Sequence, residues 1–189
     1  ITPVEGKSGL YVIPGYDGST TGGNVAVRVT DDGVIIVDNK FSHSFEMITA
    51  EVRKVTSQPV KYVLDTHHHF DHAGSNADFM DIGEVIAHRN ARSNIIRNDQ
   101  PGAPRIVFTD QTAVFLGGVE ARAHYFGRGH TNGDAVIHFP DLRTIHTGDL
   151  VVWGERSDGS TLSPFMDYGN GGSGVEWTAT LDGVLDRMS

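Results

Sequence analysis

The stretch that decides the fold is Thr66-His67-His68-His69-Phe70-Asp71-His72. It follows residues 60–65, a short apolar and β-branched run that predicts a buried strand. It precedes residues 73–80, which predict one or two turns of helix. The cluster therefore lies where a strand ends and a helix begins, and in open α/β sheets that is where ligands bind.

The same cluster indicates a metal site. Four histidines and two carboxylates fall within residues 65–72, and a divalent ion would supply the positive charge that holds such donors together. Imidazole with carboxylate suits zinc, iron or manganese. His67 and His69 alternate and so point the same way from an extended backbone, with His68 pointing away. Asp71 and His72 follow at the turn and can face a second ion. An accidental histidine-rich loop is the weaker alternative, because the cluster is internal and follows a strand.

The motif resembles a known family. The pattern H-x-H-x-D-H resembles the signature of the metallo-β-lactamase superfamily of hydrolases, and it is carried by His67, His69, Asp71 and His72. Three further segments are similar to that family's in the same order: residues 33–38, 127–131 and 146–149. The resemblance runs from Leu10 to the end of the chain.

The resemblance implies an α/β fold, an αββα sandwich of mixed sheets flanked by helices, in a single domain over residues 1–189. It also implies two adjacent metal positions. The ligands of the first would be His67, His69 and His130. The ligands of the second would be Asp71, His72 and the bridging Asp149.

The carboxyl end departs from the family pattern. The family normally has one more strand after the last helix, ending in a histidine of the second metal, whereas no histidine follows His146 here. We expect a fragment whose fold is completed by a missing segment or a separate chain, because a sheet edge would otherwise stay open. A weak second metal completed by water, or a single metal, are the alternatives.

Composition limits the class of protein. Over 189 residues, 38% hydrophobic and 21% charged side chains predict a soluble globular chain. No apolar run approaches the ~20 residues of a membrane span. The formal charge of −9 argues against nucleic acid as a partner. The absence of cysteine excludes disulfides, thiol nucleophiles and the family's cysteine-liganded β-lactamases. A removed secretory signal is compatible with the start at Ile1, and the compartment stays open.

Periodicity and turn signals predict the elements. The strands are expected at residues 10–13, 25–30, 34–37, 60–65, 84–88, 112–116, 119–126, 135–139 and 144–147, and the helices at 44–57, 90–98 and 175–188. Ser44 is expected to cap the first helix, and the last helix is expected to carry its apolar residues on one face: Leu181, Val184, Leu185 and Met188. The glycine-rich residues 14–24 predict a hairpin tip or a flap over the metals. Asp38 either orients a metal-bound histidine or caps a turn. The aromatic residues of segment 153–170 either wall a substrate pocket or pack on the core.

These features predict a metal-dependent hydrolase that acts on a small molecule. A metal-bound hydroxide would attack the carbonyl of an ester, thioester, lactone or lactam, with one or two zinc ions (Zn2+) or with iron or manganese. Asp71 and Asp149 would orient the nucleophile, and Asp71 would shuttle its proton. The bridging Asp149 resembles glyoxalase-II-type thioesterases and lactonases more than true β-lactamases.

Two alternatives remain. His67, His130 and Asp149 could form the mononuclear iron triad of the family's persulfide dioxygenases. The chain could also bind metal or a partner without turnover.

Overall fold

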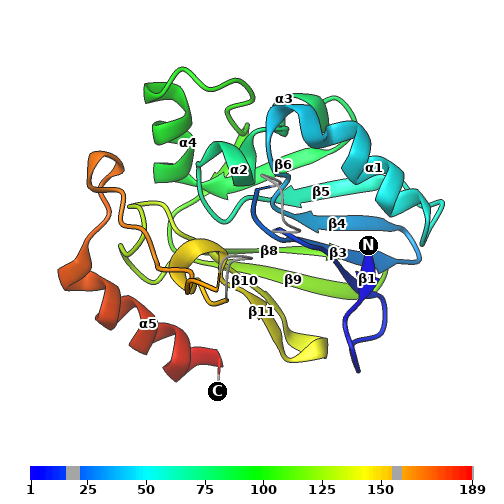
Figure 1. Ribbon diagram of the computed structural model, residues 1–189. Coiled ribbons are helices and arrows are strands. Elements are labelled where there is room, and N and C mark those ends of the chain that lie inside the picture. Colours follow the sequence, from blue (N-terminus) through cyan, green and yellow to red (C-terminus); the bar gives the residue numbers. More distant parts are fainter. Residues whose placement is uncertain (16–21, 155–158, 189) are drawn as a thin grey trace.

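The computed structural model describes residues 1–15, 22–154 and 159–188. Its strands form two sheets, with helices on the outer side of each (Figure 1). The first sheet has the order β1-β2-β3-β4-β5-β6-β7 and the second the order β11-β10-β9-β8. The strands are β1 (Thr2–Pro3), β2 (Leu10–Ile13), β3 (Val25–Thr30), β4 (Gly33–Val37), β5 (Val60–Leu64), β6 (Glu84–His88), β7 (Ile106–Phe108), β8 (Gln111–Leu116), β9 (Val119–His124), β10 (Val136–Phe139) and β11 (Thr144–His146).

The first sheet is mixed. Strands β1 to β4 pair antiparallel, whereas β4 to β7 pair parallel. The helices are α1 (Phe45–Arg53), α2 (Phe70–Ala73), α3 (Asn76–Phe79), α4 (Arg89–Arg97) and α5 (Gly174–Met188). In Figure 1, α1 to α4 lie over the first sheet and α5 lies beside the second. None of these helices, within the described part of the chain, combines the length and apolar character that crossing a membrane requires.

The side chains of β4 are buried on both faces of the sheet, and their alternating direction explains the layers. Ile35 and Val37 face the second sheet and pack in one core with Ile137 and Phe139. Val34 and Ile36 face the other way, and they pack in a second core with Ile48 of α1 and Phe79 of α3. A third cluster joins α5 to the outer face of the second sheet through Val136, Leu150 and Val184. Helix, sheet, sheet and helix therefore stack as the expected αββα sandwich.

Several element boundaries differ from the sequence prediction. The helix expected at 44–57 spans only Phe45–Arg53, and the Ser44 side chain makes no capping hydrogen bond. Its last turn tightens, because Val55 N donates to Val52 O at 3.0 Å, and the chain then extends toward Pro59. The short strands β1 and β7 were not predicted, since runs of two and three residues carry too little periodicity.

The apolar face of α5 is also narrower than predicted. Val184 is 5% exposed, whereas Leu185, expected on the same face, is 66% exposed. Successive residues of a helix lie about 100° apart, so a face centred on Thr180 and Val184 leaves Leu185 at its border.

Candidate metal centre

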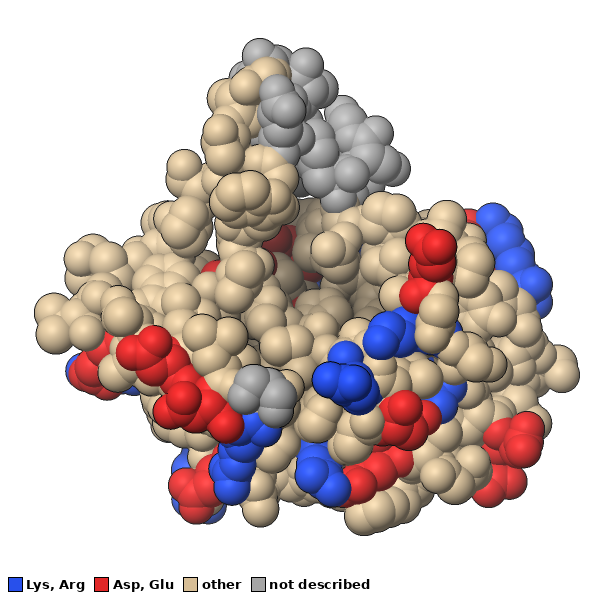
Figure 2. Space-filling model, turned by 90° about the horizontal axis from the view of Figure 1, so that it is seen from below, with Lys and Arg blue, Asp and Glu red and all other residues tan. Residues whose placement is uncertain are grey.

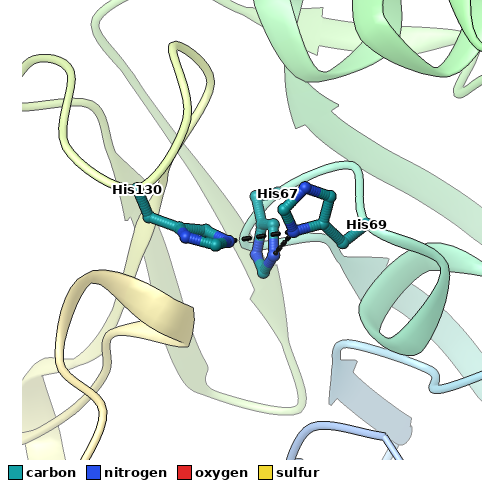
Figure 3. A group of neighbouring side chains, drawn as sticks. All are labelled: His67, His69 and His130. Carbon is teal, nitrogen blue, oxygen red and sulfur yellow. Dashed lines mark hydrogen bonds between the residues drawn. The ribbon is translucent and has the colours of Figure 1, made fainter. Parts of the chain in front are cut away.

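The first histidine group is assembled from two segments that are distant in sequence. His67 and His69 lie in the turn between β5 and α2, and His130 lies in the loop between β9 and β10. Figure 3 shows the three rings pointing toward one another. His67 Nε2 lies 3.1 Å from His69 Nδ1, and His130 Nε2 lies 2.9 Å from the same atom. These three nitrogens can therefore ligate a single ion.

The opposite nitrogens of two rings face groups that only accept hydrogen bonds. His130 Nδ1 lies 2.6 Å from the carbonyl oxygen of Phe165, and His69 Nε2 lies 2.8 Å from Asp167 Oδ2. Burial alone would raise the pKa of Asp167, but hydrogen bonds from His69 and Asn170 lower it to about 2, so the carboxylate is ionised. His130 Nδ1 and His69 Nε2 therefore carry the protons.

The proton position on the third ring, that of His67, follows from its contact with the Thr66 hydroxyl group. Thr66 Oγ1 donates its one hydrogen to Asp38 Oδ2 at 2.8 Å, so it can only accept from His67 Nδ1, at 3.1 Å. His67 Nδ1 thus carries the proton, and its Nε2 is an unprotonated lone pair.

The three unprotonated nitrogens, His67 Nε2, His69 Nδ1 and His130 Nε2, therefore point their lone pairs toward one another. None of them carries a proton that could form a hydrogen bond between the rings. Between neutral rings the contacts of 2.9 and 3.1 Å are repulsive, and a cation among them removes that repulsion. Burial, followed by the neighbouring histidines, lowers the pKa of His67 well below its usual range, which disfavours an added proton. The donor set fits a divalent metal with nitrogen ligands.

A second group lies beside the first and combines His67, His72 and Asp149. His72 comes from α2, and Asp149 comes from the turn Gly148–Leu150 after β11. His72 Nε2 lies 3.2 Å from Asp149 Oδ1 and 3.7 Å from Asp71 Oδ2. Five of the six residues predicted as ligands therefore lie in these two groups, and Asp71 lies beside the second group but is not a member of it.

Asp38 resolves the choice between its two predicted roles. It is fully buried, and its Oδ2 accepts a hydrogen bond from His72 Nδ1 at 2.8 Å. Burial alone would lower the pKa of His72, but the Asp38 and Asp149 carboxylates raise it well above its usual range. A positive charge is thus favoured where a second ion would sit. Asp38 orients a histidine of the site, as the first of the two readings predicted.

The glycine-rich loop approaches the centre at its described end. Gly23 N donates to the carbonyl of Asp71 at 2.9 Å, and a Cβ on Gly23 would lie 2.3 Å from the His72 ring. Only glycine allows this approach. The tip of the predicted flap, residues 16–21, lies outside the described residues.

A cavity opens next to the second group. Its volume is about 370 Å3, and its lining includes His72, Asp149 and Trp153. Trp153 is 90% exposed and Phe165 is 63% exposed, so these rings do not pack on the core. The Phe165 ring lies 6.0 Å from that of His130. The core reading is therefore wrong for both rings, and the pocket-wall reading fits Trp153, which lines the cavity.

Sequence reasoning missed Asp167. It lies in a segment that has no recognisable motif, and its partner His69 is 98 residues away. His68 lies outside the two groups of His67, as expected, and its Nε2 is 3.9 Å from Asp167 Oδ2.

Comparison with known proteins agrees with this geometry. A profile of the metallo-beta-lactamase superfamily matches residues 19–182. A type 2 metallo-beta-lactamase of Elizabethkingia meningoseptica is 26% identical over 80% of this chain and 63% of its own length. The 2,4-dinitroanisole O-demethylase subunit alpha of Nocardioides sp. (strain JS1661) is 31% identical over 66% of this chain and 40% of its own. The chain thus spans less than two thirds of each of these relatives.

Solved structures support the same fold. A metallo-beta-lactamase from Pontibacter korlensis superimposes with a TM-score of 0.79 and 18% identity, over 99% of this chain and 85% of that one. The metallo-beta-lactamase IND-7 superimposes with a TM-score of 0.77 and 20% identity, over 100% and 84%. With the family profile covering most of its length, the chain belongs to the metallo-beta-lactamase superfamily.

Proposed function

We propose that this chain is a metal-dependent hydrolase that attacks the carbonyl carbon of a small ester, thioester, lactone or lactam and breaks its bond to the leaving oxygen, sulfur or nitrogen. The observation that carries the proposal is the convergence of the His67, His69 and His130 lone pairs beside a second group with a carboxylate. Membership of the superfamily supports it.

In this proposal His67, His69 and His130 hold the first ion, and Asp71, His72 and Asp149 hold the second. Zinc fits the mixture of imidazole and carboxylate donors. Bound zinc lowers the pKa of a coordinated water toward ~7 and so supplies hydroxide at neutral pH.

The carboxylates of the chain orient the nucleophile. The Asp71 and Asp149 side chains are 39% and 31% exposed, so both reach solvent. Burial alone would raise the pKa of Asp149, but the hydrogen bond from His72 outweighs it and lowers the pKa. An ionised Asp149 accepts a hydrogen bond from the attacking water. Asp71, the more exposed of the two, takes its proton and passes it to the leaving group.

The cavity indicates a small-molecule substrate. Its volume of about 370 Å3 suits a compact ligand, and Trp153 supplies an apolar wall. On the face shown in Figure 2, acidic residues lie within a hollow of the surface, and basic and acidic side chains are interspersed among the coloured residues. That pattern does not favour a polyanion such as nucleic acid.

Metal removal and return test the proposal. Elemental analysis should find one or two zinc ions per chain. Hydrolysis of a panel containing an ester, a thioester, a lactone and a penicillin-type lactam should disappear after chelation and return with zinc. Full activity in the metal-free protein would reject the mechanism, and metal uptake without turnover of any panel member would favour a binding role.

One distance favours a second candidate function. His130 Nε2 lies 3.6 Å from Asp149 Oδ2, so with His67 these residues can form a two-histidine, one-carboxylate iron site. If elemental analysis found one iron per chain and the protein consumed oxygen when given a persulfide, these results would favour the oxidative function over hydrolysis.

A further inference from the structure

The segment Phe165–Asp167, called the strap below, contacts two of the three histidines of the first group. The Phe165 carbonyl accepts from His130 Nδ1 at 2.6 Å, and Asp167 Oδ2 accepts from His69 Nε2 at 2.8 Å. The strap lies beside the His130 loop, because Asp167 N donates to His130 O at 2.9 Å. One short segment, far from the histidine motif in sequence, therefore touches ligands from both parts of the centre.

We propose that Asp167 is a positioning residue of the metal centre, whose carboxylate holds the Nε2–H of His69 and so keeps the unprotonated Nδ1 aimed at the ion. The inference rests on the metal centre of the proposed function, and it is independent of the substrate and of the reaction.

His69 needs such a tether more than its neighbours do. Its side chain is 22% exposed, whereas that of His130 is 1% exposed. Packing therefore confines the His130 ring but leaves the His69 ring open on one side. Rotation of His69 about its side-chain bonds would remove Nδ1 from the centre, and the hydrogen bond to Asp167 opposes that rotation.

The carboxylate is itself held in place. Asp167 Oδ1 accepts from the backbone N–H of Asn170 at 3.1 Å, and the Asn170 side-chain amide donates to Oδ2. Arg97 of α4 donates to Asn170 Oδ1 at 2.6 Å. The backbone N–H of Asn170 thus fixes the carboxylate in place, and the Asn170 side chain adds a further, weaker link to Arg97 of α4.

A rival reading makes Asp167 a ligand. His68, His69 and Asp167 form a third group of donors, and His68 Nε2 is buried without a hydrogen-bond partner among the described residues. For His69 to ligate there, its Nε2 would have to give up the proton that Asp167 accepts. His69 would then bridge two ions as an imidazolate. The 2.8 Å contact with a carboxylate favours the protonated nitrogen and the positioning role.

The test compares Asp167→Asn with Asn170→Ala. An asparagine has an acceptor at only one of the two carboxylate oxygen positions, so it cannot accept from both the Asn170 backbone N–H and His69 Nε2. We expect Asp167→Asn to weaken zinc binding at the first position by about 10–100-fold, measured by competition with a chromophoric chelator. Asn170→Ala removes a donor to the same carboxylate but leaves the His69 contact, and its affinity should stay within about 3-fold of the parent.

Further readouts separate positioning from folding. Thermal unfolding in the presence of chelator should be nearly the same for the parent and both variants. Asp167→Glu, which keeps a carboxylate, should retain more affinity than Asp167→Asn. In the zinc-loaded parent, proton–nitrogen NMR should show the His69 Nε2–H, and in Asp167→Asn this proton should exchange faster with water.

Two results would overturn the inference. One is unchanged zinc affinity in Asp167→Asn. The other is the loss of one whole ion from the stoichiometry of that variant with no change in the affinity of the others, which would make Asp167 a ligand of a separate site. A chain that binds zinc as predicted but hydrolyses nothing would reject the proposed function and leave this inference intact.

Discussion

At the level of single residues, Asp38 has the most constrained position in the centre. It is fully buried and has a positive φ of 61°, and its carboxylate accepts from Thr66 and His72. Asparagine tolerates this backbone conformation, so Asp38→Asn changes charge and hydrogen bonding rather than the chain path. The residue thus allows the electrostatic part of the centre to be tested separately.

We predict that Asp38→Asn lowers the free energy of unfolding by about 2–3 kcal/mol, because a buried group loses charge-assisted hydrogen bonds. Denaturant unfolding of the metal-free protein measures it. Asp32→Asn in an exposed turn is the matched control and should change stability by less than about 0.5 kcal/mol. Equal effects of the two substitutions would contradict the role given to Asp38.

Gly23 offers a steric test of His72. Because a Cβ at this position would lie 2.3 Å from the ring, Gly23→Ala must displace His72 or the loop. We expect at least a ~10-fold fall in kcat/KM, since small misplacements at a catalytic centre are costly. Gly183→Ala, in α5 and against Phe126 rather than the centre, is the control and should leave kcat/KM unchanged. Normal turnover by Gly23→Ala would contradict the claim that this close approach holds His72 in its working position.

At the level of elements, α5 provides a matched pair of adjacent residues. Val184 is buried in the cluster with Val136 and Leu150, whereas Leu185 is mostly exposed. We predict that Val184→Ala destabilises the fold by about 1–3 kcal/mol through a cavity, while Leu185→Ala changes stability by less than about 0.5 kcal/mol. Thermal or denaturant unfolding of the two variants measures this difference. If α5 instead had the broader apolar face that spacing alone predicts, Val184→Ala and Leu185→Ala would destabilise the fold by similar amounts.

The helices and strands also show which features of secondary structure the local sequence pattern predicts. The strands 10–13, 25–30 and 84–88 begin and end where periodicity places them, because each alternates or is bounded by turn residues. The helix at 44–57 was predicted too long, because apolar spacing continues through Val55 while the chain has already turned toward β5. Element type was thus predictable, and the ends depended on the path to the next strand.

At the level of the whole molecule, Asp134 links stability to pH. Burial raises the pKa of its carboxyl to about 6, although hydrogen bonds from Thr131 oppose this. The folded state therefore holds the proton more tightly than the unfolded state does. The stabilising contribution is complete below the ordinary pKa of 3.8 and is lost as pH rises through about 6. A shift of this size corresponds to on the order of 3 kcal/mol.

We therefore expect Asp134→Asn to remove a decline in unfolding free energy between about pH 4 and pH 6 that the parent chain shows. Denaturant unfolding across this range, with chelator present for both proteins, measures it. Asp134 interacts with His130, so the difference between the curves reports Asp134 together with this interaction. Parallel curves would rule out the raised pKa.

Much of the centre was readable from the linear sequence. His67, His69, Asp71 and His72 fall within one turn after a strand, so their proximity is a local property of the chain. His130 and Asp149 were identified by resemblance, and the two sheets bring them to the same edge. Local spacing explains why the first four residues could be named in advance, and the family resemblance explains the other two.

The proton positions on those rings depended on the tertiary structure. The partners of their opposite nitrogens are Asp38, Thr66, the Phe165 carbonyl and Asp167, and the last lies 98 residues from His69. No periodicity connects such distant positions, because they meet only when two sheets and their loops have packed. Sequence could therefore name the candidate ligands, whereas packing alone decided which nitrogen of each ring faces the centre.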